Sequence, residues 1–291
     1  MCSTSLQDLI AKATTQCQSY NISNYSFAIF TLLECYTSKN KLAYLTQPKQ
    51  IIKQDQAQKF KSSISQLIRG KPLYRIIGER DFFGLSLTLN DDTLEPRFDT
   101  EIVVELAIKH IKNLLKTTNE LNFLDIGVGS GAISLALLNH YRDYDIKATG
   151  IDISHDCIIA TKLNAKKYNL QHRLRLVQSN LFNNIADVFD LIISNPPYIP
   201  SNHINNLDDI VKNYDPLIAL DGGEDGLFFY RQIAAKASQH LKENGLVIVE
   251  IGSTQKHDVI TIFKEAAYEL IDSQLDYSNL DRALVFKRVF Y

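Results

Sequence analysis

The feature that most restricts the fold of this chain is an alternation of short apolar runs and helical patterns between residues 122 and 252. The apolar runs are nearly continuous, as in strands that are covered on both faces of a sheet. The helical segments between them are long enough to carry the chain from one parallel strand to the next. The sequence therefore predicts an α/β fold with a mostly parallel sheet. Strands are expected at 122–127, 146–153, 174–179, 189–195 and 245–252, and helices at 130–141, 155–169, 225–241 and 254–267.

The end of the chain departs from this alternation. Residues 268–277 and 283–290 both have strand character, and only a short turn at 278–281 joins them. Because this connection is too short for a crossover, the two strands are expected to pair antiparallel. The sheet should thus end with a reversed strand.

Residues 3–75 have helical rather than alternating periodicity. Apolar side chains recur in two stripes, at 27–36 and 60–68, and Gly70-Lys71-Pro72 ends the pattern. Nothing in this region brings polar side chains together as a catalytic site would. We expect a small all-helical domain over residues 1–76.

A hairpin is expected next, because residues 80–90 alternate apolar and polar side chains around Gly84. We assign residues 77–98 to a hairpin linker and residues 99–291 to the α/β domain. The helix that opens this domain is expected to have Asp99 as its N-cap.

The charge of the chain is unevenly distributed. The net charge of the 291 residues is −2, but residues 1–78 carry ten Lys/Arg and three acids, whereas residues 79–291 carry 21 and 30. A basic N-terminal domain is typical of a domain that meets an acidic or phosphate-rich partner. A solvated, lysine-rich helical surface gives the same count, so both interpretations stay open.

Cysteines and apolar runs restrict the setting of the protein. The four cysteines are scattered, without a CxxC pair or neighbouring histidines, which favours a reducing compartment and no metal site. The N-terminus lacks a signal-peptide pattern, and no apolar run reaches the roughly 18 residues of a membrane span. We therefore expect a cytoplasmic protein without a membrane partner.

A glycine-rich loop follows the first predicted strand of the α/β domain. Gly127-Val128-Gly129-Ser130-Gly131 lies between that strand and a helix. We expect its backbone to approach a ligand closely, with loop N–H groups facing the ligand's polar end. Asp152 ends the next strand, 21 residues beyond Gly131, where a carboxylate can accept hydrogen bonds from both hydroxyls of a ribose. Together these features predict a site for a nucleoside-containing cofactor.

Two classes of cofactor fit such a loop. A dinucleotide needs a pyrophosphate site with GxGxxG spacing, whereas this loop reads GxGxG. S-adenosylmethionine needs a place for its methionine tail, and Asp125, ahead of the glycines, can lie near the tail's ammonium group. This spacing and the reversed final strand resemble the seven-stranded S-adenosylmethionine-dependent methyltransferases, whose sheet is mostly parallel with an antiparallel last strand.

The fourth parallel strand ends in Asn195-Pro196-Pro197-Tyr198, a corner that two prolines make stiff. Ligands of open α/β sheets bind outside the carboxyl ends of the strands, so Asn195 should lie beside the cofactor. We expect its side-chain oxygen and the Pro196 carbonyl to accept hydrogen bonds from a planar NH2 group, which favours charge on that nitrogen during methyl transfer. Tyr198 would lie flat against the planar group and orient it.

At this point the chain as a whole resembles the HemK-type protein-(glutamine-N5) methyltransferases, which modify peptide chain release factors. The resemblance implies that the helical domain docks the release factor and that the α/β domain methylates the glutamine of its Gly-Gly-Gln loop. The motifs that carry it run in order from residue 72 to 286: PLYRIIGERDFFGLSL, EPRFDTE, LDIGVGSGAISLAL, GIDIS, ISNPPYIP, YDPLIALDGGEDGLFFYRQI, LVIVEIG and LDRALVF.

Carried over by position, the resemblance implies that residues 127–131 and Asp152 hold S-adenosylmethionine and that residues 195–198 hold the substrate glutamine. Asn195 then also lies against the cofactor. Arg97 and Thr100 belong to a block that either approaches the active site or has a structural role.

Two positions depart from the pattern of the family. Asn180 stands where many relatives have an acid, but its amide can still accept a hydrogen bond from the adenine amino group, and Leu181 or Phe182 can pack on the ring. Phe98 replaces a proline that is common in the Pro-Arg-Pro-Asp-Thr-Glu version of its motif, which we expect to change local packing rather than chemistry.

Other functions share the Asn-Pro-Pro-Tyr motif. Adenine-N6 methylation of nucleic acid needs a basic surface and a pocket for a flipped base, and the acidic α/β domain argues against a direct nucleic-acid substrate. A glutamine methyltransferase of a ribosomal protein would use the same chemistry, and the N-terminal helical domain should distinguish it. A binding module with a vestigial site is the last alternative, against which the intact glycines and Asn195 weigh.

Overall fold

The computed structural model describes residues 4–289, and the chain divides into two compact units between Gly78 and Glu79. We call them the helical unit and the α/β unit. Cys2 lies outside the described residues, and so does Phe290, with which the expected strand at 283–290 ends. Within residues 4–289, every helix is too short or too polar to traverse a bilayer. The same residues contain no group of His, Cys, Asp and Glu side chains that could hold a metal ion.

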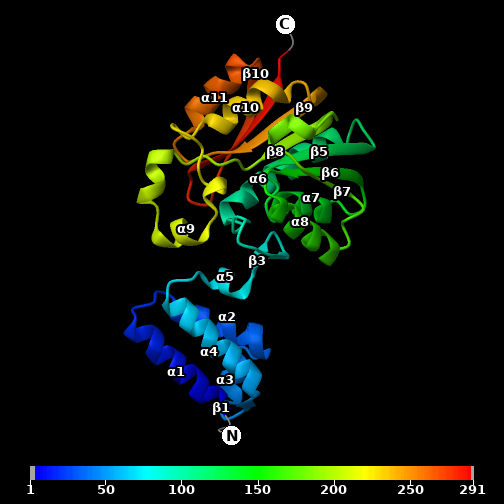
Figure 1. The fold of residues 1–291 in the computed structure, drawn as a ribbon. Coiled ribbons are helices and arrows are strands. Elements are labelled where there is room, and N and C mark those ends of the chain that lie inside the picture. The colour runs from blue at the N-terminus through cyan, green and yellow to red at the C-terminus, as the bar shows by residue number, and fades with distance from the viewer. Residues whose placement is uncertain (1–3, 290–291) are drawn as a thin grey trace. The chain divides into compact units, whose positions relative to one another are not determined.

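The helical unit is built around the two apolar stripes of the sequence. Its helices are the blue and cyan ribbons of Figure 1. Leu32 and Phe60, one from each stripe, are completely buried in its core together with Leu6 of the first helix. Two short strands pair antiparallel and add a small ladder to the expected helices. The elements are β1 (Thr4–Ser5), α1 (Leu6–Ser19), α2 (Tyr25–Thr37), α3 (Lys41–Thr46), β2 (Ile51–Ile52), α4 (Gln54–Ile68) and α5 (Leu73–Ile77).

The α/β unit contains the expected seven-stranded sheet, with strand order β10-β11-β9-β8-β5-β6-β7. Neighbouring strands from β7 to β9 are parallel, and β11, the last strand of the chain, runs antiparallel to both of its neighbours. The predicted fold class is confirmed. The strands are β5 (Glu120–Ile126), β6 (Asp145–Asp152), β7 (Leu174–Gln178), β8 (Phe189–Ser194), β9 (Leu241–Glu250), β10 (Tyr268–Leu275) and β11 (Asp281–Arg288).

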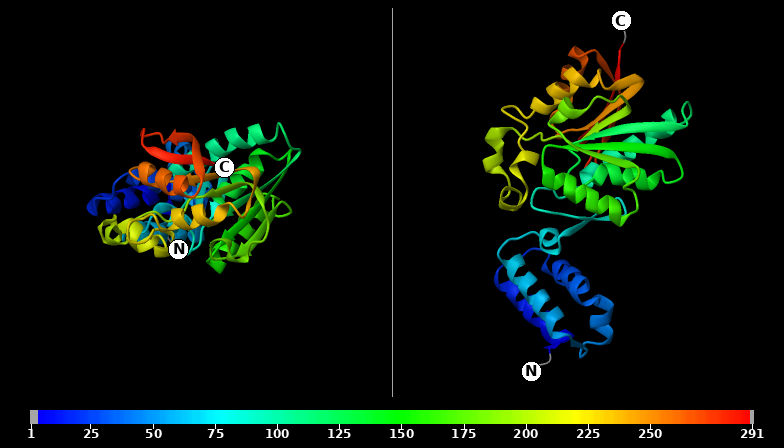
Figure 2. Two further views of the ribbon diagram at one scale, coloured as in Figure 1. Left: turned by 90° about the horizontal axis from the view of Figure 1, so that it is seen from above. Right: turned by 45° about the vertical axis from the view of Figure 1, so that its right-hand side comes forward.

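Helices cover both faces of this sheet, which explains the nearly continuous apolar strands (Figures 1 and 2). One face packs against α6, α7 and the end of α8, and the other against α10 and α11. The helices are α6 (Phe98–Leu114), α7 (Ala132–His140), α8 (His155–Lys167), α9 (Asp209–Tyr214), α10 (Phe228–Ala237) and α11 (Lys256–Glu265), with 3-10 turns at η1 (Leu181–Asn184), η2 (Ser201–Asn206) and η3 (Leu217–Ala219).

The order of the strands reverses between β5 and β8. The chain moves from β5 to β6 and β7 on one side, and then returns to place β8 on the other side of β5. Ile126 and Ser194 are register partners at the carboxyl ends of these two strands. The glycine loop and the Asn-Pro-Pro-Tyr corner therefore leave the sheet from adjacent positions.

Three local expectations are corrected. Helix α6 begins at Phe98 with Arg97 as the N-cap, so Asp99 lies in the first turn, where its carboxylate is 3.5 Å from Nη2 of Arg282. Strand β9 begins at Leu241 rather than at residue 245, because Leu241 pairs with Phe189.

The third correction concerns the hairpin of β3 (Glu79–Phe82) and β4 (Leu85–Thr88). It belongs to the α/β unit, where Phe82 and Leu87 are buried in the same core as α6. The hairpin is thus a packed part of that unit and not a free bridge between domains.

Candidate active site

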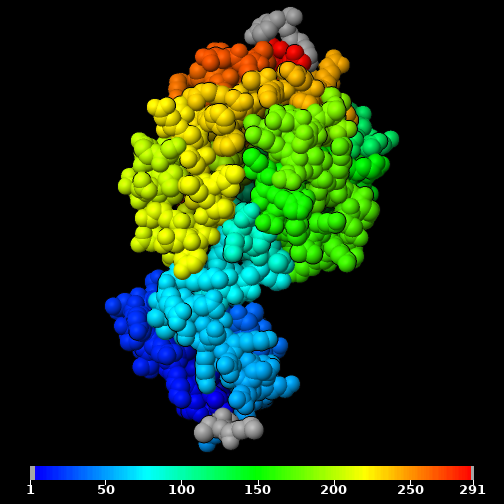
Figure 3. Space-filling model, in the orientation of Figure 1, coloured from blue at the N-terminus to red at the C-terminus, as the bar shows by residue number. Residues whose placement is uncertain are grey.

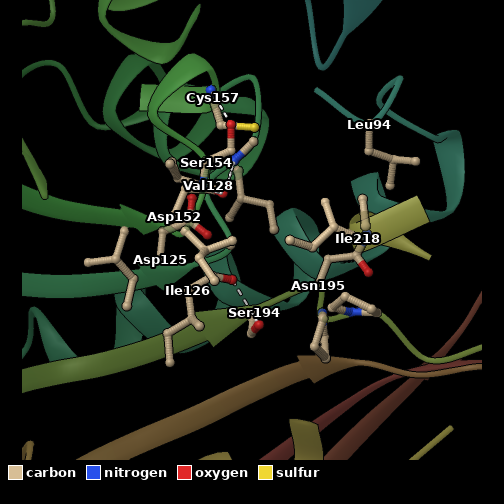
Figure 4. A pocket seen from close by; sticks show the side chains of 18 of the residues that line it. Leu94, Asp125, Ile126, Val128, Asp152, Ser154, Cys157, Ser194, Asn195 and Ile218 are labelled. Atoms are coloured by element: carbon tan, nitrogen blue, oxygen red, sulfur yellow. Dashed lines mark hydrogen bonds between the residues drawn. The ribbon is translucent and has the colours of Figure 1, made fainter. Parts of the chain in front are cut away.

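A cavity of about 370 Å³ opens at the carboxyl ends of the parallel strands in the α/β unit. Figure 3 shows a hollow between the yellow and the green parts of this unit. In Figure 4 the side chains of Val128 and Asp152 lie on one side of the pocket, and Asn195 and Ile218 lie on the other. The predicted site residues that line it are Gly127, Val128, Gly129, Ser130, Asp152, Asn180, Leu181, Asn195, Pro196 and Pro197. Gly131 and Tyr198 do not line it.

The glycine loop has the conformation that its glycines allow. Gly127, Gly129 and Gly131 have φ values of 76°, 56° and 85°, in the left-handed region that other residues rarely adopt. At Gly131 a Cβ atom would also lie 2.9 Å from Cγ2 of Thr161. Gly131 therefore serves the packing of the loop against α8, although it does not reach the cavity.

The expectation that the loop N–H groups face a ligand is wrong for most of them. The N–H groups of Gly127 and Val128 both donate to the Ile151 carbonyl at 2.9 Å, and that of Gly131 donates to the Val128 carbonyl. The N–H of Gly129 donates to Oδ2 of Asp152 at 2.9 Å. The bonds to Ile151 and Asp152 fix the loop to the end of β6, so the loop forms a fixed wall of the cavity.

Asp152 joins two parts of the cavity wall. Its carboxylate accepts from Gly129 N–H through Oδ2 and from Ser154 N–H through Oδ1, at 3.0 Å. Burial raises the pKa of this carboxyl, and the backbone hydrogen bonds oppose the shift. Asp152 also lines the cavity, so its carboxylate lies within reach of a ligand there.

Asp125 has one carboxylate oxygen without a hydrogen-bond partner among residues 4–289. Its carboxyl is almost completely buried, and Oδ2 accepts from both the N–H and the hydroxyl of Ser134, at 3.1 and 2.6 Å. Oδ1 is buried and accepts no hydrogen bond from the part of the chain that the structure describes. Burial raises the pKa of Asp125 to about 6. Because the residue lines the cavity, a cationic or hydrogen-bonding group of a ligand would satisfy this oxygen.

The Asn-Pro-Pro-Tyr corner is fixed to its neighbours at both ends. Ser194 donates from its hydroxyl to the Ile126 carbonyl at 2.9 Å, which ties β8 to β5 where the corner begins. Asn195 donates from Nδ2 to Oγ1 of Thr100 at 3.0 Å. Tyr198 packs against the core beneath α10 and α11, and burial raises the pKa of its hydroxyl to about 12. Its predicted contact with a substrate stays a prediction.

The far end of the corner is held by Gln255. Its Nε2 donates to the carbonyls of Tyr198 and Gly226, at 2.9 and 3.2 Å, and its Oε1 accepts from Gly252 N–H at 2.9 Å. One side chain thus joins three turns. The DGGEDG segment packs its backbone directly on the corner, since a Cβ on Gly222 would lie 2.8 Å from Cα of Tyr198.

Comparisons with known proteins agree with this geometry. The Methyltransferase small domain family matches residues 104–269, and the PrmC N-terminal domain family matches residues 8–78. A relative from Agrobacterium fabrum, named release factor glutamine methyltransferase, is 41% identical over 84% of this chain and 84% of its own length. One of the same name from Clostridium acetobutylicum is 31% identical over 97% of this chain and 98% of its own.

This chain belongs to the release factor glutamine methyltransferase family. A solved structure of a methyltransferase from Pyrococcus furiosus shares the fold, with a TM-score of 0.51 and 19% identity over 79% of this chain and 100% of that one. The resemblance that the sequence motifs indicated is confirmed, and the protein is a methyltransferase.

The two positions that depart from the family pattern lie in different surroundings. Asn180 and Leu181 line the cavity, whereas Phe182 is buried and stacks on the ring of His240 at 4.7 Å, so it is not available to a ligand. Phe98 is 59% exposed, with the guanidinium of Arg80 at 4.8 Å from its ring centre.

Sequence reasoning missed Glu250 as part of the site. Glu250 ends the strand of the LVIVEIG motif and is 1% exposed. A carboxylate at the end of an otherwise apolar, buried run is the sequence signal that could have indicated it. The neighbouring block of α6 also contributes, since Arg97 and Thr100 line the cavity and Arg97 forms an ion pair with Asp215.

We predict that Gly226→Ala displaces the corner and lowers methyl transfer about 100-fold, the cost of a misplacement of about 1 Å. The new Cβ would lie 2.4 Å from the Tyr198 carbonyl oxygen. Gly84→Ala is the matched control, because Gly84 has a similar φ of 76° but open space around it. Turnover that falls equally in both variants, or in neither, would contradict the role assigned to the contact.

We predict that Asp125→Asn stabilises the protein more at pH 8 than at pH 5. The folded state raises the pKa of Asp125 from 3.8 to about 6. The neutral carboxyl therefore makes its full contribution to the free energy of unfolding below pH 3.8, and this contribution is lost as the pH rises through about 6. Asparagine is neutral at every pH, so the variant does not lose this contribution to stability as the pH rises. Thermal unfolding of both proteins across this range measures the difference, and a constant difference would refute the assignment.

Proposed function

We propose that this chain transfers the methyl group of S-adenosylmethionine to the side-chain amide nitrogen of the glutamine in the Gly-Gly-Gln loop of class I peptide chain release factors. The observation that carries the proposal is the shared cavity of the glycine loop and residues 195–197. The register pair of Ile126 and Ser194 brings the glycine loop and the Asn-Pro-Pro-Tyr corner to adjacent strand ends, which supports a cofactor bound beside a substrate amide. The printed names of the curated relatives indicate the same substrate.

The donors and acceptors in the cavity fit S-adenosylmethionine. Oδ1 of Asp125 is a buried acceptor without a partner, which suits the ammonium group of a methionine tail. Asp152 suits a ribose, and Asn180 and Leu181, which also line the cavity, suit an adenine ring. When bound, the cofactor supplies an electrophilic methyl group on a sulfonium.

The corner suits a carboxamide. An amide nitrogen is a poor nucleophile, because its lone pair is delocalised into the carbonyl. Oδ1 of Asn195 and the Pro196 carbonyl would accept hydrogen bonds from the two N–H groups of the substrate amide. They would thereby stabilise the positive charge that develops on its nitrogen. The methylated nitrogen then loses its proton readily, so no strong base is needed at the corner.

Transfer of labelled methyl groups tests the substrate. The protein is incubated with labelled cofactor and, separately, with a release factor, its Gln→Ala variant in the Gly-Gly-Gln loop, a ribosomal protein fraction and duplex DNA. Label is expected in the release factor alone. Label in DNA or in the ribosomal fraction, or label that persists in the Gln→Ala variant, would overturn the assignment.

A variant at the corner tests the mechanism. Asn195→Ala should lower kcat by about 100- to 1,000-fold, the range found when one group that stabilises transition-state charge is removed. Cofactor affinity, measured by calorimetry, should stay within several-fold, because the loop and Asp152 are untouched. Normal turnover at saturating cofactor would show that Asn195 has another role.

A further inference from the structure

A buried carboxyl group lies directly behind the Asn-Pro-Pro-Tyr corner. Ser194 on β8 pairs in register with Val249 on β9, so the next residues, Asn195 and Glu250, leave the two strands side by side. Glu250 is 1% exposed and does not line the cavity. Glu250 is therefore placed to act on the cavity through Asn195, which does line it.

Glu250, Thr100 and Asn195 form one polar group. Nδ2 of Asn195 donates to Oγ1 of Thr100 at 3.0 Å. The Glu250 carboxyl lies beside these two side chains, and its buried Oε2 has no hydrogen-bond partner among residues 4–289. Burial raises the pKa of Glu250 to about 7, and the hydrogen bonds from Thr100 and Asn195 oppose that shift. The charged neighbours of Glu250 are Arg282 of β11, which favours its ionised form, and Asp99 of α6, which disfavours it.

This group determines which way the Asn195 amide faces. An ionised carboxylate only accepts hydrogen bonds, so it selects the NH2 side of the asparagine and excludes the oxygen side. With Nδ2 bonded to Thr100 and the Glu250 carboxyl beside it, Oδ1 is the polar atom that remains for a ligand. The opposite orientation would present an NH2 group to the NH2 of a substrate amide, and two donors cannot bond to each other.

We propose that Thr100 and Glu250 are positioning residues for methyl transfer, which hold the NH2 group of Asn195 and thereby fix its Oδ1 as the acceptor for the substrate amide. This inference rests on the proposed function, because it assigns the substrate a planar NH2 group. Thr100 connects the start of α6 to the corner, and Glu250 connects β9 to it.

Kinetics of a matched pair of variants test the proposal. Thr100→Val removes the hydroxyl and keeps the shape, and it should lower kcat about 10- to 100-fold while KM for the cofactor stays within a few-fold. Thr100→Ser restores the hydroxyl and should recover most of the loss. Thr37→Val is the control for loss of a buried threonine hydroxyl, because the Thr37 hydroxyl donates to a helix carbonyl in the helical unit. This variant should leave kcat unchanged.

Glu250→Gln tests the carboxylate. A glutamine can present its own NH2 group to Asn195, so the variant should lose kcat and retain cofactor binding. Equal kcat in wild type, Thr100→Val and Glu250→Gln would overturn the proposal. A loss in Thr100→Val that Thr100→Ser does not recover would also overturn it, because packing rather than the hydroxyl would then be responsible.

An NMR measurement decides the question without turnover. The protein is labelled with 15N-asparagine, and the side-chain NH2 signals of Asn195 are assigned by their absence in Asn195→Ala. In the wild type these protons should exchange slowly with water and shift as Glu250 titrates, and both features should disappear in Thr100→Val and Glu250→Gln. Unchanged signals in the two variants would refute the positioning role. A wild type that methylates no release factor but shows these signals would refute the proposed function alone.

Discussion

The pairing of β5 with β8 is the constraint on which the site depends. Ile126 and Ser194 lie opposite each other at the carboxyl ends of these strands, and the Ser194 hydroxyl bonds the Ile126 carbonyl. A shift of one residue in this register would turn the side chains of β8 to the opposite face of the sheet, into the wrong core. The core that α6 and α7 cover and the core that α10 and α11 cover both hold the register in place. The stability of the sheet and the geometry of the site thus have the same origin.

Segments that are distant in the sequence hold the corner in place. Thr100 lies at the start of α6, Glu250 ends β9 and Gln255 precedes α11, and all three contact residues of the corner. Gly222 and Gly226 allow the DGGEDG segment to lie against the corner without a side chain between them. The motifs that flank the site in the sequence therefore both hold the corner and line part of the cavity, as Arg97, Thr100 and Ile218 do.

The fold was largely predictable because each strand carries its own signal. Buried apolar runs, the glycine turn and the short connection before β11 are local patterns, and the sheet follows from them. The hydrogen bonds of the glycine loop were not predictable in this way, because their acceptors, the Ile151 carbonyl and the Asp152 carboxylate, belong to another strand. Glu250 was missed for a similar reason. Its role depends on the register between β8 and β9, and the sequence of β9 alone does not contain it.

The double attachment of Asp152 has a consequence for ligand entry. Because one carboxylate already anchors both the glycine loop and the turn at Ser154, these walls are fixed before any ligand arrives. Ligand binding then orders little of the backbone, so the conformational entropy of this wall is lost during folding and not during association. A pocket of this kind should have nearly the same shape when empty and when filled, and successive turnovers can proceed without a refolding step at this wall.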